Sequence, residues 1–241
     1  MSRLKIAIIL LLAAIIVVAG ALLPMVVGEY LNAQGKNVLK TAPVSNLELK
    51  FGEDVSVRER LCAFAKSEYF YEIHSRDANL TYLDLKQIVE QQVQDMKIAG
   101  LVEDELDTVD FGATLQLCYT PLRPDDSYLM WFVEVSGKNS FLMLFIDDQT
   151  GRVFRMDYDL YVAEEWDNQK QDKHLQALQQ VYLMGLGSRF REEFVRFEGL
   201  TEETRYNDYY FETVVRWEDP EFGTMTIAFM ISQYSYHISL S

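Results

Sequence analysis

The side chains best suited to metal chemistry are spread along this chain rather than gathered into a motif. His74, His174 and His237 stand far apart, and the sequence holds neither a His-Glu-x-x-His nor a Cys-x-x-Cys pattern. The acidic loop from Asp147 to Gly151 begins like a calcium loop, but Tyr158 stands where such a loop has a bidentate glutamate. The sequence therefore predicts no metal site.

Two glycine-containing segments can be compared with catalytic loops. Gly185 to Ser188 lacks the glycine that follows serine in a nucleophile elbow, and Ser136 to Ser140 lacks the earlier glycine of a phosphate loop. We interpret the first as a helix end and the second as a hairpin turn. The carboxylate pairs Glu164-Glu165 and Glu192-Glu193 are adjacent, so on a helix they point about 100° apart and do not share a substrate. We predict no catalytic residue and no cofactor.

Two groups of side chains are candidates for other roles. Cys62 and Cys118 are the only cysteines, and outside the cytoplasm they could form a disulfide or remain two small buried side chains. Tyr206, Tyr210 and Tyr236 would suit partner binding if they lay on an exposed face, because aromatic patches favour peptide or glycan contact. Packing in the core is the alternative for these tyrosines.

These residues follow an apolar segment from Ile6 to Gly28 that contains no charged residue and is long enough to cross a bilayer as a helix. Arg3 and Lys5 precede it and Glu29 follows it, which places the N-terminus in the cytoplasm and the rest of the chain outside. A cleaved signal peptide is the alternative, but its apolar core is usually about 7 to 15 residues long. We predict a single-pass protein of the cell membrane.

The composition indicates that the part of the chain outside the membrane is folded and acidic. Hydrophobic residues make up 49% of the chain, and its formal net charge is −15. Such a composition favours a compact fold over disorder, and its charge argues against nucleic acid as a partner. The chain is long enough for one large domain or two small ones with a real core.

Local patterns predict helices first and strands later. Ser56 with Glu59 is spaced as a capping box, and Thr81 with Asp84 can cap a second helix that ends at Gly100. The apolar period then changes to two, which predicts four strands joined as an antiparallel meander at residues 110–119, 129–135, 141–146 and 153–161.

A second unit follows an acidic, amide-rich stretch. Apolar spacing predicts a helix over residues 175–182, a short continuation at 190–195 and two strands at 209–217 and 225–231. The apolar phase then flips, which predicts a bulge or bend near Ser232 and Gln233. Whether these strands extend the first sheet or form their own is left open by the sequence.

One stretch resembles a known family. Trp131 to Val135, then Phe141 to Ile146, then Asp147-Asp148-Gln149-Thr150-Gly151 resembles the end of a PepSY-like domain, mainly over residues 129–155. The resemblance implies an exported or membrane-attached module that binds or inhibits peptidases, or regulates, and has no catalytic residues. A tight hairpin turn uses the same residue types, because Asp and Thr cap turns and Gly adopts a positive φ.

Together these patterns predict an α+β fold class, in which an N-terminal transmembrane helix precedes helices packed on antiparallel sheet, with two helix-plus-hairpin units as one arrangement. The expected organisation is a cytoplasmic N-terminus (1–5), a transmembrane helix (6–28), a tether (29–46), a first unit (47–162) and a second unit (163–241). We expect a binding or regulatory protein with a protein partner outside the cytoplasm. The alternatives are an exported hydrolase, whose site forms only in the fold, and a structural subunit of an envelope complex.

Overall fold

The structure is a computed structural model, and it describes residues 55–67, 69–73, 78–102, 105–119, 127–161, 168–206 and 210–241. The predicted transmembrane segment 6–28 and tether 29–46 lie outside these residues. None of the helices within the described ranges combines the length and the apolar character needed to cross a membrane.

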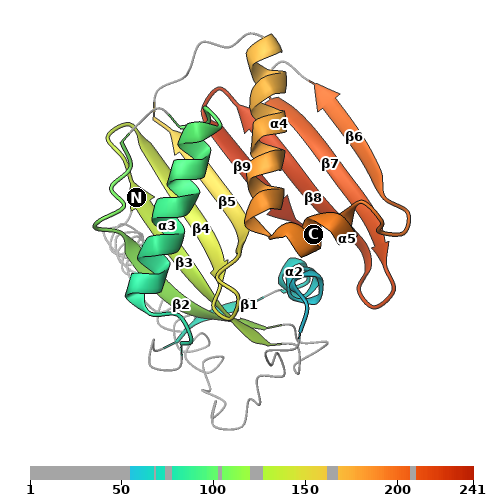
Figure 1. Cartoon of the computed structure of the whole chain (residues 1–241), viewed down its shortest axis with the longest axis horizontal. Coiled ribbons are helices and arrows are strands. Elements are labelled where there is room, and N and C mark those ends of the chain that lie inside the picture. The colour runs from blue at the N-terminus through green and yellow to red at the C-terminus, as the bar shows by residue number, and fades with distance from the viewer. Residues whose placement is uncertain are drawn as a thin grey trace, which may run out of the picture. The chain divides into compact units, whose positions relative to one another are not determined.

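The described residues form one antiparallel sheet of nine strands, in the order β1-β2-β3-β4-β5-β9-β8-β7-β6 (Figure 1). Along the chain the strands are β1 Tyr69–Glu72, β2 Gly112–Tyr119, β3 Tyr128–Ser136, β4 Ser140–Asp147, β5 Val153–Leu160, β6 Thr201–Tyr206, β7 Tyr210–Asp219, β8 Gly223–Ser232 and β9 Ser235–Leu240.

The sheet consists of two meanders joined at its centre. The run β2 to β5 forms one half and the run β6 to β9 the other, and each run follows a long helix. The halves join where β5 pairs with β9, with Tyr158 opposite Tyr236. The strand order is symmetric about this pair, because β5, β4, β3 and β2 follow one another on one side and β9, β8, β7 and β6 on the other. The second unit therefore extends the first sheet.

The predicted α+β fold class is wrong, because the described residues are predominantly sheet. Two strands that lack an apolar period, β1 and β6, add to the sheet at its two edges. The second unit contributes four strands instead of the predicted hairpin, since the change of phase near Ser232 and Gln233 is a turn into β9 rather than a bulge within one strand.

The helices are α2 Val57–Ala65, α3 Tyr82–Ile98, α4 Asn168–Gly185 and α5 Ser188–Phe194. Both predicted capping boxes are confirmed, because Ser56 and Glu59 cap α2 while Thr81 and Asp84 cap α3. In Figure 1, α3, α4 and α5 lie over one face of the sheet, and α2 lies at the end of the sheet near the β4–β5 turn.

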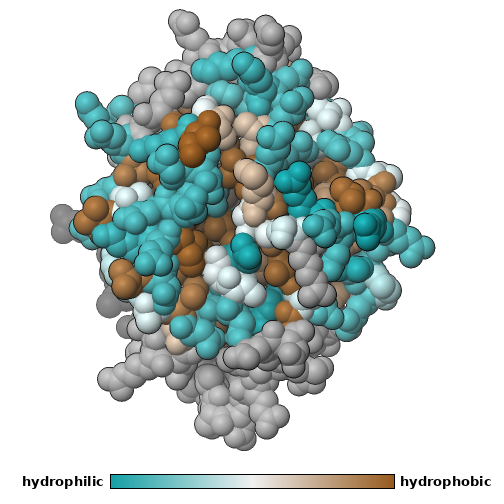
Figure 2. Space-filling view, viewed as in Figure 1, coloured by the Kyte–Doolittle hydropathy of each residue, from teal (hydrophilic) through white to brown (hydrophobic). Residues whose placement is uncertain are grey.

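The helices bury one face of every central strand. In α4, Tyr182 packs edge-on against Phe229 of β8, and in α3 the Gln92 side chain reaches Met156 of β5. Leu144 pairs with Met156 and is fully buried beneath the same helices. Hydrophilic residues cover the outer surfaces of α3 and α4, with hydrophobic residues between them (Figure 2). Truncating one of the buried side chains to alanine typically costs about 2 to 5 kcal/mol.

Candidate functional site

The predicted tyrosine patch does not form as expected. Tyr236 is fully buried beneath α4, where its hydroxyl lies 3.1 Å from Nδ1 of His174. Tyr210 is half-buried at the start of β7, and the side chain of Tyr206 lies outside what the structure describes. Tyr236 therefore takes the alternative of packing in the core, because its face of the strand is the one the helices cover.

Cys62 and Cys118 are free, buried thiols, so the structure does not show the disulfide that the sequence allowed. The Cys62 sulfur lies 3.6 Å from Oδ2 of Asp219. Burial is the main cause that raises the pKa of both thiols well above the ordinary cysteine value. Both side chains therefore act as small protonated groups of the core.

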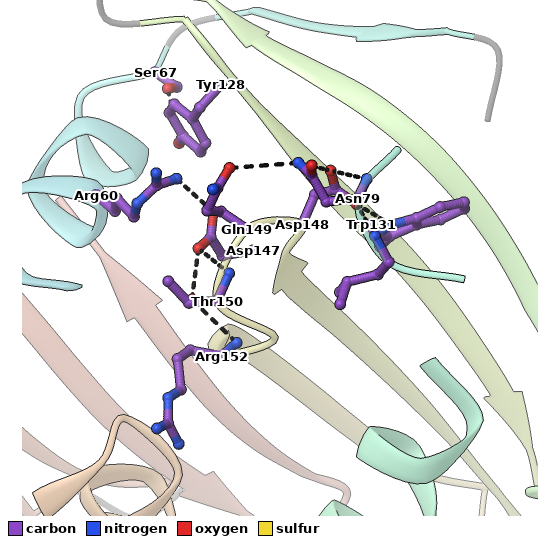
Figure 3. A network of polar contacts seen from close by, with 11 residues as sticks. Arg60, Ser67, Asn79, Tyr128, Trp131, Asp147, Asp148, Gln149, Thr150 and Arg152 are labelled. Carbon is purple, nitrogen blue, oxygen red and sulfur yellow. Dashed lines mark hydrogen bonds and ion pairs between the residues drawn. The ribbon is translucent and has the colours of Figure 1, made fainter. Parts of the chain in front are cut away.

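The residues that carry the PepSY-like resemblance build a buried turn between β4 and β5 (Figure 3). Asp147 accepts hydrogen bonds from the backbone and hydroxyl of Thr150, and its other oxygen pairs with Arg60 at 3.3 Å. Gly151 closes the turn with a φ of +67°, a value that a residue with a Cβ rarely adopts. Burial raises the pKa of Asp147, although the contacts with Thr150 and Arg60 act in the opposite direction.

Asp148, the next residue, fastens this turn to α3 and to the sheet. Its carboxylate accepts hydrogen bonds from the backbone N–H of Asn79 at 2.8 Å, that of Leu80 at 3.1 Å, and the Trp131 indole at 2.7 Å. Trp131 and Asp148 are therefore direct partners in a structural network. This contact bridges the 17 residues that separate Trp131 from Asp148 in the sequence.

The turn also sets the direction of Arg152, whose side chain leads away from Asp147 and Thr150 (Figure 3). The guanidinium Nη1 donates to the carbonyl of Gly185 at 2.9 Å, at the C-terminal end of α4. A cation is favoured there by the helix dipole. Gly187 makes the close approach possible, because a Cβ at this position would lie 3.0 Å from Nη2 of Arg152.

Arg152 lines a pocket of about 460 Å³. The first turn of α2 forms one wall and the junction of α4 with α5 forms another. The remaining lining residues are Val55, Ser56, Val57, Arg58, Leu186, Gly187, Ser188, Phe190 and Glu193.

The opposite face of the sheet carries a row of half-buried or exposed aromatic and apolar side chains. We call it the aromatic face, and it comprises Phe70, Phe132, Phe141, Met143, Phe145 and Arg155. Phe132 pairs with Phe145 across β3 and β4 with ring centroids 5.1 Å apart, and Phe70 of β1 lies 6.2 Å from Phe145. The Arg155 guanidinium stands over the Phe145 ring at 5.4 Å.

A polar row lies on the same face of the sheet. Asp157 accepts from Nε of Arg155 at 2.9 Å and lies 2.9 Å from Nδ1 of His237, whose Nε2 is 3.8 Å from Asp159. Nδ1 of His237 is therefore held by Asp157, while Nε2 lies beyond hydrogen-bond distance of Asp159. Within the described ranges, no group of His, Cys, Asp and Glu side chains could hold a metal ion.

Neither the aromatic face nor the pocket at Arg152 was predicted from the sequence. The signal for the aromatic face was present in β4, where Phe141 to Ile146 is apolar on both faces and only one is needed for the core. Arg152 had no local signal, since its position depends on α4. Comparison with protein-family models, with curated proteins and with solved structures gives no match to this chain.

Proposed function

We propose that this protein is a binding or regulatory protein without catalytic activity, and that a protein partner outside the cytoplasm docks on the aromatic face. The observation that carries the proposal is the cluster of Phe132, Phe145 and Phe70 on the face of the sheet opposite α3 and α4. A sheet buried on one side usually shows water a polar second face. Here three strands contribute apolar side chains to that face, and Phe64 of α2 covers only part of the cluster, with its ring 5.7 Å from Phe145 and 6.2 Å from Phe70.

The composition of the aromatic face supports a protein as its occupant. Aromatic residues, methionine and arginine are the types enriched at protein interfaces, and all three occur here. Arg155 stands over Phe145 while it also binds Asp157, so it is held in place before a partner arrives. The polar row from Asp157 to His237 would form part of the rim.

The predicted location is consistent with this role. Residues 6–28 remain the predicted membrane attachment, and they would hold the domain at the outer side of the membrane. The PepSY-like resemblance, which implies binding or inhibition of a peptidase, stays a prediction and supplies one class of partner to test.

Site-specific photocrosslinking in the native membrane tests the proposal. A photoreactive phenylalanine analogue replaces Phe132, and the same analogue replaces Leu83 of α3 in a matched control, because Leu83 is apolar and 63% exposed on the helix-bearing side. We expect one product in the Phe132 sample that is absent from the Leu83 sample, identified by mass spectrometry.

The captured protein is then purified, and its affinity is measured for the wild-type chain and for Phe132→Ala. We expect the affinity for Phe132→Ala to be at least about ten-fold weaker, as is typical when an aromatic hot-spot residue is removed. A thermal melt of Phe132→Ala shows whether its fold is retained. Equal products from Phe132 and Leu83 would overturn the proposal. Products that contain only copies of this chain would show that the aromatic face is a self-association surface instead.

A further inference from the structure

We infer that the pocket between α2, the β4–β5 turn and the α4–α5 junction binds a small organic monocarboxylate, with Arg152 as its anion anchor. Its volume of about 460 Å³ falls within the usual range of ligand sites, about 300 to 1,000 Å³. This inference concerns a different surface from the aromatic face and does not depend on it.

Arg152 has the properties of an anchor for a carboxylate. One of its terminal nitrogens is fixed by the carbonyl of Gly185 at 2.9 Å, and its guanidinium packs closely over Gly187. No ion pair of the described residues includes Arg152. Its Nε and Nη2 donors form a planar fork, the geometry that matches a carboxylate. In a chain of net charge −15, an arginine with no acidic partner among the described residues is conspicuous.

Arg58 supplies a second, already immobilised guanidinium. Its Nε and Nη2 both bind Oδ2 of Asp219, at 2.9 and 2.8 Å, and the group lies 4.7 Å from the centre of the Phe197 ring. These contacts leave Nη1 as a donor and hold the side chain in one position. Little conformational entropy is then lost when a ligand binds.

The rest of the lining narrows the ligand class. Val55, Val57, Leu186 and Phe190 provide an apolar wall for a hydrocarbon portion. Glu193 also lines the pocket, and its charge repels a dianion more strongly than an anion with a single charge. A carboxylate with one charge and an apolar body fits these features better than a phosphate does.

The test is calorimetric titration of the full-length chain in detergent with 3-phenylpropionate. The uncharged analogue 3-phenylpropanol shares its apolar body, and we expect it to bind at least about ten-fold more weakly, because it lacks the charge-assisted bonds. N-acetylphenylalanine and its amide separate two sources of carboxylate. Stronger binding of N-acetylphenylalanine than of 3-phenylpropionate would identify a peptide C-terminus, and the reverse would identify a free acid.

Two variants of equal charge change complete the experiment. Arg152→Gln is expected to weaken 3-phenylpropionate binding by about ten-fold or more, while Arg191→Gln, on the exposed side of α5, leaves it within about two-fold. The inference is overturned if the wild-type chain binds no carboxylate at millimolar concentration, or if both variants bind equally. If Arg152→Gln fails to fold, the comparison of acid with alcohol on the wild-type chain decides the question by itself.

Discussion

Replacing Asp148 by alanine should detach the start of α3 from the sheet. The change removes the acceptor of four donors, which are the Asn79 and Leu80 backbone N–H groups, the Asn79 side-chain amide and the Trp131 indole N–H. Trp131 is 6% exposed, so water reaches its N–H poorly, and a buried donor left unpaired costs about 1 to 3 kcal/mol. Asn79 is exposed and Leu80 half-buried, so water partly replaces their acceptor and each adds about 0.5 kcal/mol.

The sum is a loss of about 2 to 4 kcal/mol, which is a large share of the roughly 5 to 15 kcal/mol that stabilises a typical domain. Urea denaturation followed by tryptophan fluorescence measures the loss. Asp159→Ala is the matched control, because Asp159 is an aspartate 41% exposed on β5, and its removal should cost less than about 0.5 kcal/mol.

Hydrogen exchange locates the effect. In Asp148→Ala we expect faster exchange in α3 than in α4, because Asn79 and Leu80 lie just before α3 and lose their acceptor. If Asp148→Ala and Asp159→Ala unfold at the same urea concentration, Asp148 does not anchor α3 and this reasoning fails. Uniformly faster exchange over both helices would mean that the turn stabilises the whole sheet instead.

Two other predictions concern the β4–β5 turn, and the first compares Gly151 of that turn with Gly100 at the end of α3. Gly100→Ala should lower the free energy of unfolding by about 1 to 2 kcal/mol, because its φ is +73° and no neighbouring atom would contact the new Cβ. Gly151→Ala should lower it by about 1 kcal/mol more, because its Cβ would stand 3.0 Å from Ile88. Urea midpoints of the two variants measure this gap, and equal costs would show that Ile88 moves aside freely. Burial raises the pKa of Asp147 above 3.8, so the folded protein holds this proton more tightly than the unfolded chain. The stability of the wild-type chain relative to Asp147→Asn should therefore be greatest below pH 3.8 and fall as the pH rises through the raised pKa. Urea midpoints over a pH series measure it, and a difference that grows with pH would contradict the sign.

Local signals in the sequence were sufficient for the starts of α2 and α3 and for strands with one apolar face, whereas α4 begins at Asn168, seven residues before the predicted helix. The capping residues Ser56 and Thr81 act within three residues of themselves, so nothing distant is needed to read them. The strand β6 was missed because its sequence, Thr201 to Tyr206, has no apolar alternation, as is common for a charged edge strand. β1 is only four residues long and lies at the opposite edge.

The candidate sites depend on contacts that local patterns do not contain. Tyr236 lies on an apolar phase of β9, and only the position of α4 decides that this phase is covered. Arg152 approaches Gly185 across 33 residues of sequence. The contact of Trp131 with Asp148 spans 17 residues and was visible only as an unexplained spacing.

The pairing of β5 with β9 has a consequence for biosynthesis. β9 is the last strand along the chain, yet it occupies the middle of the sheet, between β5 and β8. Each meander can pair locally while the chain is being made, but β5 keeps an open edge until β9 has emerged. Because such edges recruit other strands, the nascent domain is most prone to aggregation between the completion of β5 and the arrival of β9. A chaperone that shields the edge of β5 during this interval would raise the yield of folded protein more than one that acts on the helices.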